Sequence, residues 1–306
     1  MPITVTEVSF PSEGTLLRAA LFQPADSPLR SPNGAPCVVM AHGLGGTRAA
    51  GLEPFARRFA EHGLYVLCFD YRGFGASEGS PRQVVNVERQ LEDYAAAIAY
   101  ARALEAVDPR RIALWGSSFS GAHAIAAAVR DGQVAATSSQ GAMMDGLAAL
   151  FHLRRVAGLG HLLRMVGHAL VDGLSALLCL PRRLLPVVGR PGEPAVLNAP
   201  GAYEGYLAIA PADWRNEISC AWMLTLALYR PNRMAAQLHC PALFCIATED
   251  NIVPPAAMED AARRAGERAT VQRYPLGHFD IYVGEGFERA ARDQVDFFLR
   301  SLAVKP

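Results

Sequence analysis

Continuous apolar runs alternate with helix-like stretches along most of this 306-residue chain, and no other feature constrains its fold as much. The first run, residues 37–41, reads Cys-Val-Val-Met-Ala, which is typical of a strand buried on both faces. Buried strands that alternate with helices predict a doubly wound, mostly parallel α/β sheet covered on both sides. The other expected strands are residues 65–70, 111–115, 134–139, 242–247 and 270–274. The expected helices are residues 51–62, 84–104, 121–130, 255–265 and 287–302.

A long insertion interrupts this pattern. The alternation stops near Asp145, after the sixth core strand, and resumes near residue 241. Residues 147–235 contain helix-like stretches broken by proline and glycine, without a clear buried strand. We therefore expect one core made of residues 1–146 and 236–306, with a mostly helical insertion at residues 147–235.

The N-terminal region predicts a β-hairpin. Residues 3–10 and 16–22 alternate polar and apolar side chains around a short turn that contains Gly14. The first residues lack the basic segment and apolar stretch of a secretory signal. The most apolar part of the insertion, residues 169–180, contains Asp172 and is too short to cross a membrane. These features favour a cytoplasmic protein with no membrane span.

Composition argues against several kinds of chemistry. The 29 basic residues are 28 arginines and one lysine, Lys305, which lies in the C-terminal tail. A pyridoxal-phosphate Schiff base, a phosphate-binding P-loop, a protein kinase and a Ser–Lys dyad all need a positioned lysine. The net charge of zero gives no electrostatic reason to bind nucleic acid. The six cysteines show no metal-ligand spacing, so we expect neither metal nor cofactor.

An expected strand runs into an expected helix through the sequence Gly-Ser-Ser-Phe-Ser-Gly, which begins at Gly116. A serine at such a turn has a strained backbone and stands at the N-terminus of the helix, where backbone N–H groups can bind an anion. The turn needs small residues two positions before and after the serine, and Gly116 and Ser120 meet this need around Ser118. Ser117 is the competing candidate, but Phe119 lies two positions after it. The sequence therefore favours Ser118 as a nucleophile.

A candidate acid and a candidate base follow the serine. Asp250 and His278 each come just after an expected strand, in the order Ser, Asp, His. Because the carboxyl ends of parallel strands meet at one edge of a sheet, we expect all three side chains to converge there. Glu249 and Asp280 are rivals for the acid, and Asp145 is a further candidate because it follows an earlier strand.

Five motifs in register resemble the α/β-hydrolase superfamily over nearly the whole chain. They are the His-Gly-Leu-Gly-Gly turn at 42–46, Asp-x-Arg-Gly-x-Gly-x-Ser at 70–77, the serine turn, the acid loop at 249–254 and Gly-His-Phe at 277–279. The start of the chain resembles the subgroup with dienelactone-hydrolase-like, Xaa-Pro-peptidase-like and acyl-thioesterase-like members. The resemblance implies that the backbone N–H groups of Leu44 and Phe119 form an oxyanion hole. It also implies that residues 147–235 form a cap.

The triad predicts a serine hydrolase that cleaves a carboxylic ester or thioester through an acyl-enzyme. Ser118 would attack the carbonyl, His278 would transfer the proton and Asp250 would orient the imidazole. The same triad also serves acyltransferases, peptidases and C–C hydrolases, and these alternatives stay open. The alternative of another class is a ligand-binding protein that has lost turnover, although a binder has no need of all three residues. The expected partner is a small acyl ester or thioester.

The expected cap is locally basic. Residues 147–200 carry six arginines against Asp172 and Glu193. These arginines would bind an anionic part of the substrate, lie on a surface for a membrane or partner subunit, or cover apolar surface with their stems. We also consider a homo-oligomer formed through the cap. The six arginines are Arg154, Arg155, Arg164, Arg182, Arg183 and Arg190. Candidate pocket residues, each equally compatible with ordinary core, are Met143, Met144, Tyr203, Tyr206, Trp214 and Trp222.

Overall fold

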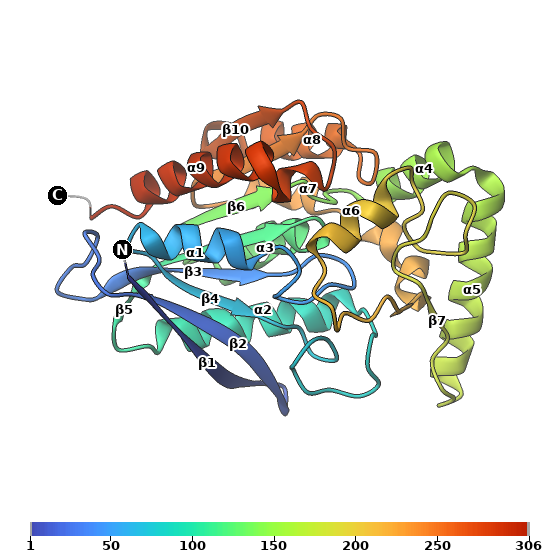
Figure 1. The fold of residues 1–306 in the computed structure, drawn as a ribbon, viewed down its shortest axis with the longest axis horizontal. Helices are drawn as coiled ribbons and strands as arrows, with labels where there is room; N and C mark the ends of the chain where they lie inside the picture. Colours follow the sequence, from blue (N-terminus) through green and yellow to red (C-terminus); the bar gives the residue numbers. More distant parts are fainter. Residues whose placement is uncertain (1, 305–306) are drawn as a thin grey trace.

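The computed structural model describes residues 2–304 and contains one eight-stranded sheet flanked by helices (Figure 1). Lys305 lies outside the described residues. The strand order in the sheet is β1-β2-β4-β3-β5-β6-β9-β10. These strands are β1 (Ile3–Ser12), β2 (Thr15–Pro24), β3 (Ala35–Ala41), β4 (Tyr65–Phe69), β5 (Val107–Ser117), β6 (Ala136–Gln140), β9 (Ala242–Ala247) and β10 (Ala269–Tyr274).

The sheet is parallel from β4 to β10 and antiparallel at its N-terminal edge. β1 and β2 form the expected hairpin, and β2 also pairs antiparallel with β4. The other neighbours in the sheet pair in parallel. This arrangement confirms the predicted α/β fold class. β5 begins earlier than expected, at Val107, which pairs with Ala35 of β3; Asp108 and Arg111 inside the strand are buried and hydrogen-bonded to each other. A strand segment that contains charged side chains does not form a continuous apolar run, so the apolar pattern does not predict it.

Helices cover both faces of the sheet. α1 and α9 pack on one face, and α2, α3 and α8 pack on the other. Within β3, the side chains of Val38 and Met40 belong to the core under α1 and α9, whereas Val39 belongs to the opposite core. The continuous apolar run therefore serves two cores. The helices are α1 (Glu53–Glu61), α2 (Val87–Arg102), α3 (Phe119–Asp131), α8 (Pro255–Ala265) and α9 (Gly284–Ser301).

The segment between β6 and β9 adds helices at the end of the molecule toward which the arrows of β3, β4 and β6 point (Figure 1). Its elements are α4 (Gly146–Ala157), α5 (Leu159–Leu177), β7 (Leu184–Leu185), α6 (Ala202–Ile209), β8 (Ile218–Ser219), α7 (Pro231–Met234) and the 3-10 helices Ala221–Leu224, Leu226–Leu228 and Ala235–Gln237. The extent of the cap, residues 147–235, stays a prediction, and we call this segment the predicted cap. Among residues 2–304, no helix combines the length and the apolar character needed to cross a membrane.

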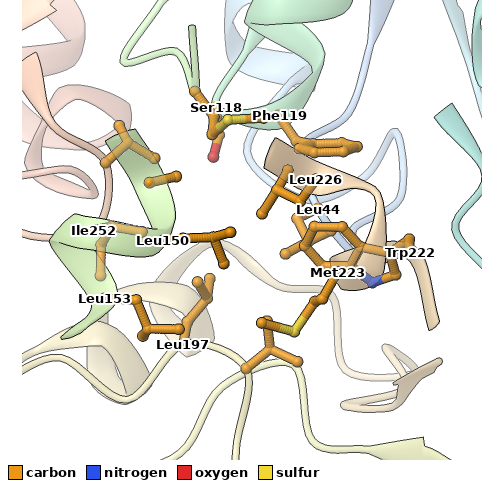
Figure 2. A pocket seen from close by; sticks show the side chains of 14 residues that line it. Leu44, Ser118, Phe119, Leu150, Leu153, Leu197, Trp222, Met223, Leu226 and Ile252 are labelled. Carbon is orange, nitrogen blue, oxygen red and sulfur yellow. The ribbon is translucent and has the colours of Figure 1, made fainter. Parts of the chain in front are cut away.

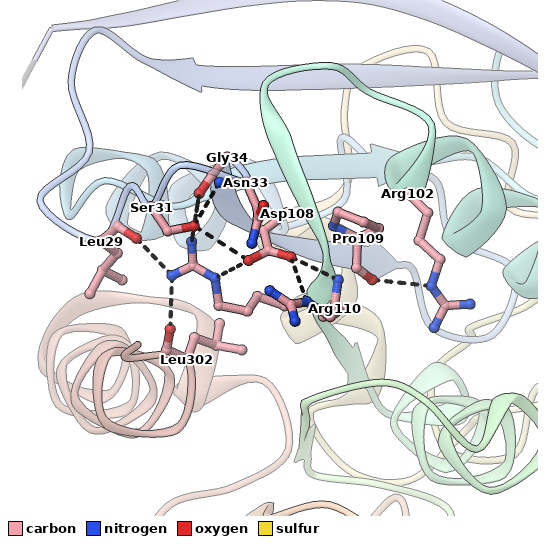
Figure 3. A network of polar contacts seen from close by, with 10 residues as sticks. Leu29, Ser31, Asn33, Gly34, Arg102, Asp108, Pro109, Arg110 and Leu302 are labelled. Atoms are coloured by element: carbon pink, nitrogen blue, oxygen red, sulfur yellow. Dashed lines mark hydrogen bonds and ion pairs between the residues drawn. The ribbon is translucent and has the colours of Figure 1, made fainter. Parts of the chain in front are cut away.

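A buried arginine holds the opposite end of the sheet together (Figure 3). Arg111 donates to the backbone oxygens of Leu29, Gly34 and Leu302 at 2.7, 2.5 and 3.3 Å. Its Nε also donates to Asp108 at 3.0 Å. One side chain thus joins the loop before β3, the start of β5 and the end of α9. Because a buried guanidinium needs such partners, this network fixes the strand ends remote from the serine turn.

Candidate active site

Ser118 occupies the turn between β5 and α3. Its φ of 57° and ψ of −121° are rare for a residue other than glycine. A Cβ on Gly116 would lie 2.1 Å from the backbone oxygen of Ser120, so this position requires glycine. A Cβ on Gly121 would lie 2.6 Å from the Cβ of Ala142. The tight packing of these small residues therefore holds Ser118 in its strained conformation.

The two serines beside Ser118 are directed into the core. Ser120 is fully buried, and its Oγ lies 3.1 Å from the Tyr71 hydroxyl. This hydrogen bond satisfies a hydroxyl at a position where glycine is commoner in such turns. Ser117 is also buried, with its Oγ 2.5 Å from the Tyr282 hydroxyl and 3.2 Å from the backbone oxygen of Gln140.

The structure brings Ser118, His278 and Asp250 together. His278 Nε2 lies 3.1 Å from Ser118 Oγ, and His278 Nδ1 lies 2.6 Å from Asp250 Oδ2. An ionised carboxylate can only accept a hydrogen bond, so Nδ1 carries the hydrogen and Nε2 is free to accept one from the hydroxyl. His278 and Asp250 are both buried, whereas Ser118 is half-buried. This is the geometry of a hydroxyl, a base and an orienting acid.

Two backbone groups fix the carboxylate of Asp250. Its Oδ1 accepts hydrogen bonds from the N–H groups of Ile252 and Val253 at 2.8 and 2.9 Å. Its Oδ2 thereby remains directed at His278. Gly141 follows β6 beside this pair, where a Cβ would lie at ordinary contact distance, 3.7 Å, from both Asp250 Oδ2 and His278 Nδ1; its positive φ of 47° is what favours glycine there.

The three rival acids make other contacts. Glu249 is exposed, and Asp280 accepts a hydrogen bond from the N–H of Gly277 within its own loop. Asp145 caps α4, accepting bonds from its first N–H groups, and pairs with Arg230 at 2.5 Å. Asp145 therefore ties the start of the predicted cap to its end.

The turn after β3 lies directly against the serine. A Cβ on Gly43 would lie 3.1 Å from the Cβ of Ser118. The backbone N–H groups of Leu44 and Phe119 have no hydrogen-bond partner among residues 2–304. His42 holds this turn, with Nδ1 2.9 Å from the Gly43 oxygen. Burial lowers the pKa of His42, so its ring is neutral at neutral pH.

A pocket opens beside Ser118 and is lined almost entirely by apolar side chains (Figure 2). Leu150 and Leu153 reach it from α4, and Trp222, Met223 and Leu226 reach it from the 3-10 helices (Figure 2). The other lining residues are Leu44, Phe119, Met143, Ala149, Val196, Leu197, Ile252 and Val253. A second, smaller hollow lies on the His278 side of Ser118. The serine thus stands between two spaces.

The candidate pocket residues are divided among several places. Met143 and Trp222 line the apolar pocket. Tyr206 lines the hollow beside His278, and its hydroxyl donates to the Leu44 backbone oxygen at 2.9 Å. Trp214 stacks on Tyr206 and donates to the Gly45 oxygen, behind the turn that follows β3. Met144 is fully buried in the core. Tyr203, also a candidate, lies under the Arg190 guanidinium.

The predicted cap arginines lie away from the serine. Although all six belong to the described residues, none of them lines the apolar pocket. Arg182 pairs with the buried Asp172 at 2.7 Å, and Arg190 pairs with Glu204 at 3.4 Å. The others are exposed and have no ion-pair partner within residues 2–304; they are Arg154, Arg155, Arg164 and Arg183. Residues 2–304 also contain no cluster of His, Cys, Asp and Glu that could hold a metal ion.

Most residues of the pocket wall were not predicted from the sequence. Leu150 and Leu153 lie on one side of α4, and Val196 and Leu197 come from an irregular loop. The spacing of Leu150 and Leu153 was the only available signal, because residues three apart share a helix face. The loop residues had no such signal.

Comparison with known proteins decides the family. A model of the alpha/beta hydrolase family matches residues 38–291. The chain belongs to this family. The quorum-quenching protein AidA of Acinetobacter baumannii is 38% identical over 309 residues, covering 100% of this chain and 98% of that protein. The thiohydrolase aneE of Aspergillus aculeatus is 42% identical over 132 residues, covering 43% of this chain and 39% of that protein.

Solved structures of alpha/beta hydrolases share the fold. GrgF from Penicillium sp. has a TM-score of 0.78 at 24% identity, covering 99% of this chain and 100% of that one. DcsB, solved in complex with its substrate analogue, has a TM-score of 0.80 at 21% identity, covering 98% of this chain and 100% of that one. At these identities the likeness concerns the fold alone.

Proposed function

We propose that this alpha/beta hydrolase cleaves carboxylic ester or thioester bonds through an acyl-enzyme on Ser118. The contact of Ser118 Oγ with His278 Nε2 at 3.1 Å, backed by Asp250, carries the proposal. His278 takes the hydroxyl proton as Ser118 attacks the carbonyl carbon, and returns it to the leaving oxygen or sulfur. Water then attacks the acyl-enzyme with His278 as base, which releases the acid and restores Ser118.

The free N–H groups of Leu44 and Phe119 support an oxyanion hole. They stand on either side of Ser118, one in the turn after β3 and one at the first residue of α3. Donors placed there would stabilise the negative oxygen of the tetrahedral intermediate, an effect worth about 3–4 kcal/mol for one donor in a related chemistry.

The apolar pocket supports a neutral acyl group as the bound part of the substrate. Its wall offers carbon and sulfur atoms but no side-chain charge. The hollow beside His278 suits the leaving group, because the proton from Nε2 must reach the leaving atom. The relative named thiohydrolase aneE supports hydrolysis as the reaction.

Acyl transfer is the second candidate. A relative named polyketide transferase grgF, from Penicillium sp., is 36% identical over 133 residues, covering 44% of this chain and 43% of that protein. A transferase would pass the acyl group from Ser118 to an alcohol or amine rather than to water. Product analysis with a short alcohol present distinguishes the two, since a hydrolase releases mainly the free acid.

Ser118→Ala should abolish turnover of aryl esters and acyl thioesters while the protein remains folded. We expect a loss in kcat of about 10⁴-fold or more, because the nucleophile is removed. A fluorophosphonate probe should label the wild type at Ser118 and leave Ser118→Ala unlabelled. Ser117→Ala is the matched control and should keep both labelling and turnover. Wild-type activity in Ser118→Ala, or no labelling of the folded wild type, would contradict the proposal.

A further inference from the structure

The outward face of α5 is apolar along its whole length. Six leucines and valines recur at intervals of three and four residues and keep between 36 and 79% of their surface exposed. They are Leu159, Leu163, Val166, Leu170, Leu174 and Leu177. Residues at these intervals share one helix face. The 19-residue helix is about 28 Å long, and Figure 1 shows it along the outer edge of the molecule.

The inward face of α5 is already fully engaged. Its buried residues include Met165, Ala169 and Asp172. Asp172 accepts two hydrogen bonds from Arg182, at 2.8 and 2.7 Å. It also accepts backbone bonds from Cys220 and Ala221 at 3.0 and 2.9 Å. The helix is therefore held as a fixed element, and its outward residues lie apart from the pocket at Ser118.

The exposed area suits a partner of protein size. Val171 and Leu178 extend the outward face to eight large side chains. A fully exposed side chain of this kind offers on the order of 100 Å² of apolar area, so eight at about half exposure offer about 400 Å². A standard interface buries about 800 Å² per partner, of which roughly 60% is apolar. The face of α5 supplies most of that apolar area.

Two glycines on the same face favour another helix over lipid. Gly160 and Gly167 lie seven residues apart, and a Cβ at either position would meet nothing within 4 Å. Glycine weakens a helix interior, and contact with a lipid surface does not offset this cost. Contact with a second helix can offset it, because that helix can approach the exposed backbone at the glycines closely.

We propose that α5 pairs with α5 of a second copy of this chain, related by a twofold axis. In an isologous contact the apolar face of α5 packs against the same face of the second copy, so the exposed leucines of both copies become buried. The margin of the face carries Arg164, which has no ion-pair partner among residues 2–304. The contact is therefore driven by apolar burial and is strengthened when salt screens the arginines.

The dimer would lie behind one wall of the candidate active site. α5 packs against the 3-10 helix Ala221–Leu224, which carries Trp222 and Met223 of the apolar pocket. A Cβ on Gly173 of α5 would lie 3.3 Å from Leu224. Pairing of α5 would thus stabilise the 3-10 helix that forms part of the pocket wall, without adding a residue to the pocket.

Sedimentation and light scattering test the proposal on the full-length protein. The wild type at micromolar concentration should have twice the chain mass of 32.8 kDa, at low and at high sodium chloride. Leu170→Asp should raise the dimer dissociation constant by about tenfold or more, because it buries a charge at the contact. Leu207 on α6 is also exposed, so Leu207→Asp is the matched control and should remain dimeric.

Gly167→Leu distinguishes pairing with a second helix from binding to a lipid surface. It fills the space of closest helix approach but enlarges the apolar face, so it should dissociate the dimer while any binding to lipid would increase. A monomeric wild type that sediments with anionic phosphatidylglycerol vesicles and is released by salt would overturn the proposal in favour of a membrane. A monomer without lipid binding, or a dimer unaffected by both α5 variants, would overturn it as well. Far-UV circular dichroism of each variant reports that it is folded.

Discussion

His123 lies beneath the serine turn, fully buried, with its ring 4.7 Å from that of Phe119. Its Nδ1 is 2.6 Å from the Tyr229 hydroxyl, and its Nε2 is 3.1 Å from Gln90 Oε1. Burial, aided by the charge of Arg130, lowers the pKa of His123 to about 3. The folded protein therefore keeps this imidazole neutral at pH values where the unfolded chain takes up a proton.

The free energy of unfolding should consequently fall as the pH drops from 6.5 toward 3. Because the unfolded state binds more protons in this window, His123 alone should cost about 2 kcal/mol between pH 7.5 and pH 5. Urea unfolding at several pH values measures the effect. His123→Gln should lose stability less steeply than the wild type. The exposed His62→Gln is the control, and an unchanged slope in His123→Gln would contradict this origin.

The helices of the predicted cap are held by buried carboxylates. Asp145 caps α4, and Asp172 anchors α5 through Arg182 and through the N–H groups of Ala221 and Arg183. Burial raises the pKa of Asp172, but the bonds from Arg182 and these N–H groups outweigh it, and the pKa lies below the ordinary value. The ionised form of Asp172 thus stabilises the fold above the ordinary carboxyl pKa and loses this effect as the pH falls through the lowered value.

Arg182→Met should destabilise α5 strongly, since it leaves Asp172 buried without its cation. Removing one partner of a buried pair costs about 3–5 kcal/mol. Limited proteolysis near the end of α5 and urea unfolding both report the change. The neighbouring Arg183→Met is the control, because only the backbone of Arg183 contacts Asp172. Equal resistance to protease in the two variants would rule out an anchoring role for the Arg182 side chain.

At the scale of the whole molecule, the apolar pocket is assembled from segments far apart in the sequence. α4, the loop at Val196, the 3-10 helix at Trp222 and the acid loop at Ile252 each supply part of the wall. The length of the pocket is therefore set by how these segments pack. Leu153, which points into the pocket from α4 (Figure 2), is a direct test of that length.

Leu153→Phe should shorten the pocket and shift the preference toward shorter acyl chains. We expect kcat/KM for a long-chain ester to fall by about tenfold relative to a short-chain ester, a typical effect of a misfitting methylene group. A series of aryl esters of graded acyl length measures this ratio. Arg154→Gln, exposed on the same helix, should leave it unchanged. An unaltered ratio in Leu153→Phe would place the acyl group elsewhere.

The α/β core, the N-terminal hairpin and the chain order of Ser118, Asp250 and His278 could all be predicted from the sequence. Strand periodicity and glycine positions are local requirements, so they are visible in a linear chain. Which apolar residues within 147–235 turn inward became clear only from the folded protein. Leu153 lines the pocket, Met165 is core and Leu170 faces outward, although all three are simply apolar in the sequence. The physical reason is that helices apolar on several sides have more than one face to bury, and the neighbouring elements select among them.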